Sequence, residues 1–200
     1  MDAETPGARQ EAVTSVLLVV ALGLTLLAFV WPSGAGGPAW ATMSSPSVPV
    51  RVVAPRIGLD AQVRPVALSR DGVLDPPADT DVVGWWDGSA RVGAGSGQVV
   101  LTGHTVRTGR GVLNRAGELR AGDRVRVRTA AGTMAYRVTR RTVWSRAELA
   151  ARAEDTFGQD AAAGPRRGRL VLVTCTGWVD GVYTRNIVVF ARPLGIRAPA

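Results

Sequence analysis

The apolar and polar residues in the second half of the chain follow the two-residue period of β-strands. Residues 124–128 read Arg-Val-Arg-Val-Arg, so alternate side chains fall on opposite faces of an extended strand. A turn at residues 130–133 leads from this segment into a second strand at 134–143. The pattern therefore predicts a hairpin with one buried face and one face that carries arginines.

Three further segments are almost wholly apolar, which is typical of strands buried on both faces. They span residues 98–102, 170–174 and 187–190. Two of them end beside residues with distinctive chemistry, because His104 follows the first segment and Cys175 follows the second. Strand ends therefore hold the candidate reactive groups.

Helical signals are scarce in this β-rich part of the chain. Ser145 and Glu148 form a capping-box pattern, which predicts a short helix through about residue 152. Shorter strands interrupted by proline are expected at 51–53, 55–59 and 61–66. Many short strands, one or two short helices and a background rich in glycine and proline favour a mainly β fold, either a closed barrel or a sandwich.

The N-terminal part of the chain has a different pattern. Residues 12–31 contain no charge and no proline, and about twenty apolar residues suffice for a helix to cross a bilayer. We expect a transmembrane anchor that follows a cytoplasmic N-terminus at 1–11. The run exceeds the apolar core of a signal peptide, about 7–15 residues, although residues 39–41 (Ala-Trp-Ala) resemble a cleavage site. Residues 32–49, rich in Pro, Gly and Ser, are expected to tether an extracellular domain at 50–195.

The charge of the chain bears on its partners. All 24 Lys and Arg positions hold arginine, and residues 41–200 contain 23 arginines against 13 acidic residues, a net charge of +10. Such a surface attracts anionic lipid head groups or phosphate-rich wall polymers, or it only keeps the domain soluble. No nucleic-acid partner is expected, because the sequence lacks a motif that combines aromatic and basic residues and the anchor places the domain outside the cell.

The only histidine and the only cysteine occupy matching places in the sequence, each after a buried strand. If the two strands run in the same direction in one sheet, His104 and Cys175 reach the same edge. An imidazole can then take the thiol proton, and the thiolate can attack a carbonyl. A lone cysteine outside the cell forms no intramolecular disulfide and is prone to oxidation, so chemistry is a good reason to keep it. A small buried structural cysteine is the alternative.

Several separated motifs occur in the order found in one family of cell-wall enzymes. They are Gly84-Trp85-Trp86, residues 97–104 (GQVVLTGH), residues 119–127 (LRAGDRVRV), residues 172–175 (LVTC) and residues 183–189 (YTRNIVV). With these motifs, residues 50–192 resemble the sortases, the membrane-anchored cysteine transpeptidases of Gram-positive bacteria. The N-terminal apolar segment, and Cys-Thr-Gly followed by Tyr-x-x-Asn, resemble the actinobacterial class F group, with class E as the near neighbour.

This resemblance implies an eight-stranded β-barrel and an acyl transfer in two steps. Cys175 would attack the Thr-Gly carbonyl of a Leu-Pro-x-Thr-Gly-like sorting signal, and His104 would protonate the departing amine. An amine of a peptidoglycan precursor would then resolve the thioester. No metal site and no cofactor are expected. Calcium in particular is not supported, because no run of carboxylates has the spacing of an oxygen-ligand loop.

An arginine completes the site of the family, and its position in this chain needs an argument. Counted back from Ala191, the register of the family falls on Asn186, whereas Arg185 lies one residue earlier. A shift of one residue turns a strand side chain to the opposite face, so Arg185 reaches the site only if it precedes the regular strand or if a bulge turns it. We expect Arg185 to be the third catalytic residue, with Thr174, Trp178 and Asn186 as substrate-binding residues.

Two other functions remain open. An L,D-transpeptidase-like wall enzyme also places His before Cys on a β-fold, but Val173-Thr174 stand where its Ser-x-Gly-Cys signature would be. A non-catalytic, anchored β-domain would instead bind wall polymer through its arginines. The two alternatives differ from a sortase in whether Cys175 forms a thioester with a sorting peptide.

Overall fold

The computed structural model describes residues 45–160 and 168–194. The expected N-terminal segment at 1–11 and anchor at 12–31 lie outside these ranges, as does the tether before residue 45. Within the described ranges, no helix has the length and apolar character needed to span a membrane.

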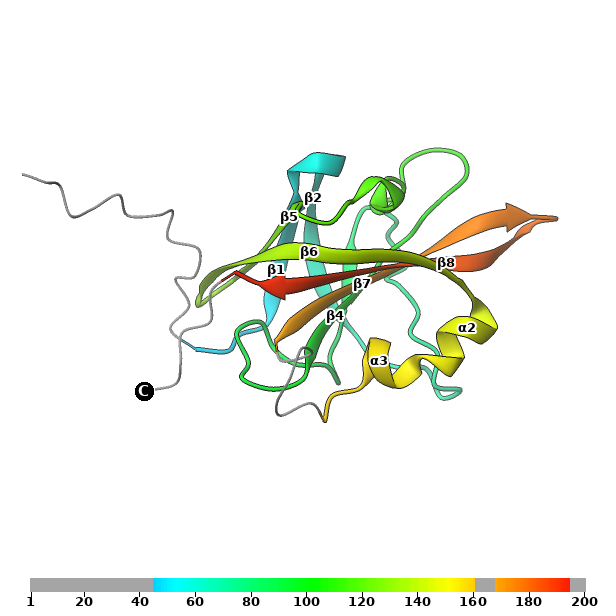
Figure 1. Ribbon diagram of the computed structural model, residues 1–200. Helices are drawn as coiled ribbons and strands as arrows, with labels where there is room; N and C mark the ends of the chain where they lie inside the picture. The colour runs from blue at the N-terminus through cyan, green and yellow to red at the C-terminus, as the bar shows by residue number, and fades with distance from the viewer. Residues whose placement is uncertain (1–44, 161–167, 195–200) are drawn as a thin grey trace, which may run out of the picture. The chain divides into compact units, whose positions relative to one another are not determined.

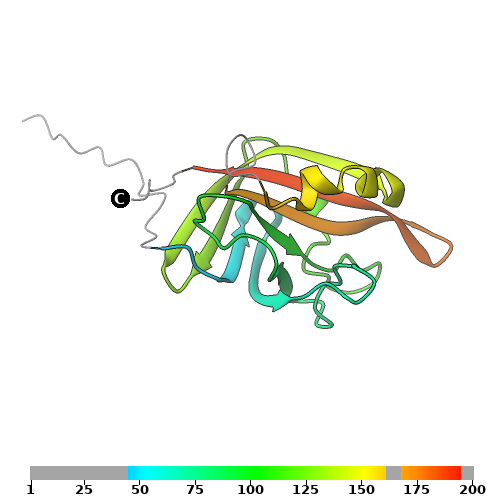
Figure 2. The same ribbon diagram turned by 90° about the horizontal axis from the view of Figure 1, so that it is seen from below.

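Eight strands of the described residues close into a barrel, in the order β1-β2-β3-β4-β7-β8-β6-β5 (Figure 1 and Figure 2). Their bounds are β1 Pro49–Ala54, β2 Leu59–Val66, β3 Val83–Trp86, β4 Gln98–Thr102, β5 Arg124–Thr129, β6 Gly132–Ser145, β7 Arg169–Val179 and β8 Val182–Pro193. The neighbours β2 and β3 pair in parallel, as do β4 and β7, whereas the other pairs are antiparallel. The expected mainly β fold and eight-stranded barrel are confirmed.

Two short helices lie between β6 and β7 in the sequence and cover one side of the barrel (Figure 2). They are α2 (Arg146–Ala151) and α3 (Ala153–Phe157). The predicted capping box opens α2: the backbone N–H of Glu148 donates to Ser145 Oγ at 3.2 Å, and the backbone N–H of Ser145 donates to Glu148 Oε2 at 2.8 Å. The helix predicted from the capping box corresponds to α2. The second helix, α3, begins at Ala153, directly after the predicted end of that helix.

The prediction of a strand at 55–59 is wrong for residues 55–57. Residues Pro55–Ile57 form a 3₁₀ helix, η1, which ends at Gly58 with a φ of 66°. A proline at the start of the turn has a fixed φ and no N–H to give to a sheet, and glycine accepts a positive φ without strain. The chain therefore turns back between the antiparallel strands β1 and β2. A second 3₁₀ helix, η2 (Ala116–Glu118), precedes β5.

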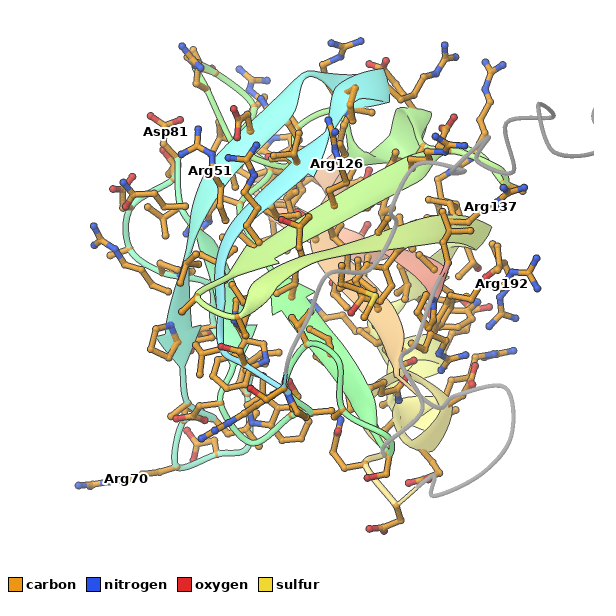
Figure 3. The ribbon with its side chains drawn as sticks, turned by 90° about the vertical axis from the view of Figure 1, so that its left-hand side faces the viewer. Arg51, Arg70, Asp81, Arg126, Arg137 and Arg192 are labelled. Atoms are coloured by element: carbon orange, nitrogen blue, oxygen red, sulfur yellow. The ribbon has the colours of Figure 1, made fainter. Side chains whose placement is uncertain are left out.

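Arginines project outward from the predicted hairpin, which is formed by β5 and β6. Every second residue of β5 is buried and the arginines between them are exposed, as the alternation predicted. Figure 3 shows Arg126 and Arg137 on the outside of these strands, with Arg192 of β8 nearby. Arg137 lies directly opposite Arg192 in the β6–β8 pairing. Positive charge is therefore concentrated on the outer face of this part of the barrel.

Residues of β7 alternate between two apolar clusters. Leu170 and Leu172 belong to the cluster that fills the barrel. Val171 and Val173 belong to an outer cluster, in which Leu149 of α2 and other helical side chains cover the sheet. The run at 170–174 is thus buried on both faces, as its apolar continuity predicted. The same alternation places Cys175 on the face of Val171 and Val173.

A buried glutamine joins α3 to the barrel. The Gln98 side chain is fully buried, and its Nε2 donates to the backbone oxygens of Asp155 at 3.2 Å and Gly158 at 2.9 Å. Its Oε1 accepts a hydrogen bond from Arg169 Nε at 2.9 Å. These bonds satisfy polar groups that burial would otherwise leave without partners, so they hold α3 against β4 and β7.

We expect Gln98→Leu to lower the free energy of unfolding by about 1–3 kcal/mol, because buried carbonyl oxygens lose their donor. Urea unfolding followed by circular dichroism measures this change. Gln62→Leu makes the same replacement at an exposed position of β2 and should change the free energy by less than about 0.5 kcal/mol. Equal losses in the two variants would contradict the structural role of Gln98.

Candidate active site

A cleft of about 600 Å³ lies beside α2, where β4 ends and β7 continues past it. Residues from β7, β8, both helices and the segment 72–76 line it. Its lining includes His104, Thr174, Cys175, Asn186, Arg146 and Tyr183. The cleft therefore contains the only histidine and the only cysteine of the chain.

Parallel pairing of β4 and β7 brings these two residues together. Thr102, the last residue of β4, lies opposite Val173 of β7. Beyond the paired residues, Thr174 is hydrogen-bonded to Gly103 and Thr105, so His104 lies beside the residue that precedes Cys175. The strands do run in the same direction, as the sequence interpretation required. One detail differs from the expectation: β7 does not end at Cys175 but extends to Val179, because it pairs with β8 beyond the barrel.

Thr174 fixes the spacing between the two strands. Its side chain is buried, and its Oγ1 donates to the backbone oxygen of Gly103 at 2.7 Å. A second hydrogen bond, of 2.8 Å, joins the hydroxyls of Thr174 and Thr105. Both bonds connect the residue before Cys175 to the residues on either side of His104. The hydroxyl of Thr174 is thus engaged with the protein, which indicates a positioning role for a residue expected to contact substrate.

Cys175 faces the cleft with an exposed side chain. It follows the odd-numbered residues Val171 and Val173 onto the outer face of β7, on the side of the helices. The cleft wall partly desolvates the sulfur, which raises the pKa of the thiol, and the positive charge of Arg146 acts in the opposite direction. A raised pKa keeps most molecules in the thiol form at neutral pH, so a nearby base is needed to form the thiolate.

His104 is held by a backbone carbonyl. Its Nε2 lies 2.8 Å from the oxygen of Pro77. A carbonyl oxygen can only accept a hydrogen bond, so Nε2 must carry the proton in this arrangement. The ring nitrogen that remains available as a base is then Nδ1. A hydrogen bond of this kind fixes both the tautomer and the orientation of the imidazole.

Arg185 and Asn186 occupy opposite faces of β8. Asn186 lies directly opposite Cys175 and lines the cleft, whereas Arg185 lies opposite Thr176 and is not among the lining residues. Neither route that would bring Arg185 to the cleft is present. The regular strand already begins at Val182, and the register shift in the β6–β8 pairing falls between Val138 and Arg140. The expected placement of Arg185 at the site is therefore not found.

Sequence reasoning missed Arg146, the arginine that does line the cleft. It is the first residue of α2, and its Nη2 donates to the backbone oxygen of Tyr183 at 3.1 Å. The capping box gave the start of this helix, but it carries no information on the surface against which the helix packs. The sequence therefore indicated where α2 begins, but the position of Arg146 in the cleft depends on how the helix packs against β8.

Trp178 lies in the hairpin beyond the barrel, outside the group of residues that line the cleft. Its side chain is exposed and makes an edge-to-face contact with Tyr183, with ring centroids 4.8 Å apart. Tyr183 itself lines the cleft. Trp178 therefore packs against Tyr183 and does not itself line the cleft. Its closeness to Cys175 in the sequence had predicted a direct contact with substrate.

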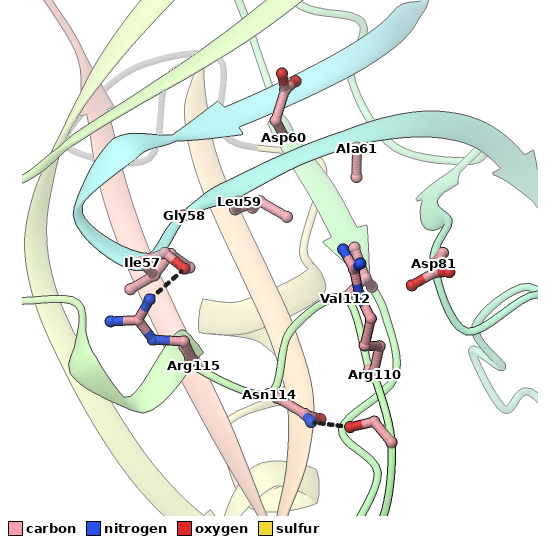
Figure 4. Close-up of a pocket in the computed structure, with 12 residues that line it drawn as sticks. Ile57, Gly58, Leu59, Asp60, Ala61, Asp81, Arg110, Val112, Asn114 and Arg115 are labelled. Carbon is pink, nitrogen blue, oxygen red and sulfur yellow. Dashed lines mark hydrogen bonds between the residues drawn. The ribbon is translucent and has the colours of Figure 1, made fainter.

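A second pocket, of about 560 Å³, is formed by β2 and the segment 109–115 (Figure 4). Arg115 Nη1 donates to the backbone oxygen of Ile57 at 3.3 Å along one wall. Asp60 and Asp81 also line this pocket, but among the described residues no group of three or more His, Cys, Asp or Glu side chains is placed to hold a metal ion. Its lining residues include neither His104 nor Cys175, so we assign the chemistry to the first cleft.

Comparison with known families gives this arrangement a context. A family profile described as the sortase domain matches residues 52–194. The chain belongs to the sortase family. Its membership favours the sortase interpretation over the L,D-transpeptidase alternative that the sequence left open.

Solved sortases share the fold. Sortase C-1 from Actinomyces oris is 25% identical, with a TM-score of 0.57 and 76% of each chain covered. Sortase A from Corynebacterium diphtheriae is 18% identical, with a TM-score of 0.56, covering 76% of this chain and 63% of that one. A Clostridium perfringens sortase D5 transpeptidase is 17% identical, with a TM-score of 0.55 and coverage of 74% and 79%. No curated protein matches the chain.

The electrostatic setting of Cys175 leads to a prediction on its reactivity. Iodoacetamide reacts with the thiolate, so the midpoint of the alkylation rate against pH should lie above the value of about 8.5 for an unperturbed thiol. The same chain unfolded in urea is a matched control, because it presents the only cysteine of the sequence to solvent. A midpoint in the folded chain at or below that of the unfolded chain would contradict the cleft described for Cys175.

Proposed function

We infer that this sortase-family chain is a cysteine transpeptidase that cleaves a Leu-Pro-x-Thr-Gly-like sorting signal and transfers the acyl group to an amine. The observation that carries the proposal is that the only histidine and the only cysteine line the same cleft. Family membership gives this pair its reaction class.

The first half-reaction forms a thioester on Cys175. Nδ1 of His104 accepts the thiol proton, since Nε2 is bound to the Pro77 oxygen. The thiolate then adds to the carbonyl carbon between Thr and Gly of the signal. When the intermediate collapses, the C–N bond breaks, and the imidazolium returns its proton to the departing glycine amine. The acyl group remains on the sulfur.

In the second half-reaction His104 takes a proton from the incoming amine, and Cys175 is the leaving group. An amine of a peptidoglycan precursor enters the cleft, adds to the thioester carbonyl and loses a proton to His104. The C–S bond breaks, and Cys175 leaves as a thiolate that regains the proton. One peptide bond is broken and one is formed, so the reaction needs no cofactor or external energy source.

The walls of the cleft suit a peptide with an apolar start. Leu74 and Pro76 come from the segment before β3, and Leu149 and Phe157 come from the two helices. Such a surface favours the Leu and Pro side chains of the signal through burial of apolar area. Asn186 faces the same cleft from β8 and can donate its amide N–H to a carbonyl of the peptide.

The cellular setting belongs to the same proposal. The apolar run at 12–31 would anchor the chain, with the barrel outside the cell, where sorting signals and peptidoglycan precursors are found. Cys-Thr-Gly followed by Tyr-x-x-Asn supports a class F-like group, with class E as its neighbour.

Incubation of the purified chain with a small library of sorting peptides and several amines tests this function. Intact-mass spectrometry should detect an acyl adduct on the wild-type chain with at least one peptide, followed by transfer to an amine. Cys175→Ala should give no adduct and keep its fold, because the exposed thiol contributes little to the core. Peptide cleavage by Cys175→Ala would overturn the proposal, and absence of any adduct would favour a non-catalytic wall-binding domain.

A further inference from the structure

Arg146 is held in the cleft by two structural elements. The capping box between Ser145 and Glu148 sets the start of α2, so Arg146 becomes the first residue of the helix. The hydrogen bond from Nη2 to the Tyr183 oxygen then ties the guanidinium to β8. Tyr183 stands three residues before Asn186, which faces Cys175. The guanidinium is therefore positioned between the helix and the β7–β8 hairpin, on the wall of the cleft.

Arg185 points to a different surface. A side-chain carbon placed on Gly177 would lie 3.4 Å from Cβ and Cδ of Arg185, so the stem of the arginine packs against Gly177. Ser145 of β6 lies opposite Arg185 on the other side of β8. Asn186 is the residue opposite Cys175, and its neighbour Arg185 falls on the other face of β8 by the alternation of strand side chains.

The two arginines also act on different titratable groups. The charge that acts on the Cys175 thiol is that of Arg146, which offsets part of the rise in pKa caused by burial. Arg185 instead contributes to the environment of Glu148. Hydrogen bonds from Ser145 lower the pKa of that carboxyl, and the charges of Arg152 and Arg185 act in the same direction.

We propose that Arg146 supplies the guanidinium that contacts the acyl carbonyl of the peptide, in the role the sequence assigned to Arg185. The proposal rests on the transpeptidase function given above. As Cys175 Sγ bonds to the carbonyl carbon, the electron pair of the C=O double bond moves onto oxygen, and N–H groups of Arg146 donate to that oxygen. When the C–N bond breaks, the pair returns to the carbonyl. Arg146 keeps its protons throughout, and only His104 transfers one.

Four single variants separate this role from its alternatives. Arg146→Gln removes the charge but keeps an amide that can bond the Tyr183 oxygen, and Arg146→Lys keeps the charge without the forked donors. Arg185→Gln tests the residue expected from the sequence. Arg152→Gln removes the same charge from the far end of α2 and serves as the matched control.

Two measurements are made on each variant: the rate of acyl-adduct formation with a sorting peptide, and the pH midpoint of iodoacetamide alkylation. Arg146→Gln should slow adduct formation by about 10²- to 10³-fold, the usual cost of an oxyanion donor, and raise the alkylation midpoint. Arg146→Lys should keep the midpoint near that of the wild type and still lose most of the rate. Arg152→Gln and Arg185→Gln should change both quantities much less.

The alkylation readout needs no sorting peptide, so the two proposals can fail separately. Absence of an adduct on the wild-type chain would overturn the transpeptidase function, while a midpoint shift confined to Arg146→Gln would still place this guanidinium at the thiol. An unchanged midpoint in Arg146→Gln would overturn its placement. If Arg185→Gln lost most of the rate of adduct formation and Arg146→Gln kept it, the catalytic role would belong to Arg185. Urea unfolding of each variant checks that the barrel is intact.

Discussion

The parallel pairing of β4 with β7 is the constraint on which the rest of the site depends. It sets Thr102 opposite Val173, and the residues that follow, His104 and Cys175, line the same cleft. Thr174 reinforces this spacing through its hydrogen bonds to Gly103 and Thr105. Parallel neighbours cannot be joined by a tight turn, and the chain between β4 and β7 contains β5, β6 and both helices.

The connection between the strands also makes the cleft a reaction site. It brings α2 and α3 over the outer face of β7 and β8, where apolar side chains of the helices cover the sheet. The cleft left beside α2 is apolar enough to raise the pKa of the Cys175 thiol. The same connection delivers the positive charge of Arg146 to the thiol. The desolvation that raises the pKa of Cys175 and the positive charge that opposes this rise therefore both come from the connection between β4 and β7.

Sequence patterns predicted the features that depend on local order. Continuous apolar runs located β4 and β7, and their ends located His104 and Cys175, because a strand buried on both faces is apolar at every position. The faces of Arg185 and Asn186 depend on pairing with β6 and β7, which lie far away in the sequence, so counting residues could not decide between them. Arg146 was missed for the same reason, since docking of α2 is tertiary. At 55–59, proline and Gly58 overrode a weak strand pattern.

Cross-linking across the β4–β7 pair tests this account most directly. His104→Cys, treated with a short bifunctional thiol reagent, should link to Cys175 within one chain and gain the mass of a single bridging group. Gln62→Cys offers an exposed thiol on β2, three strands away in the barrel order, and should give two separate adducts. Intact-mass spectrometry distinguishes the two products. Bridging no more frequent in His104→Cys than in Gln62→Cys would contradict the parallel register and the site built on it.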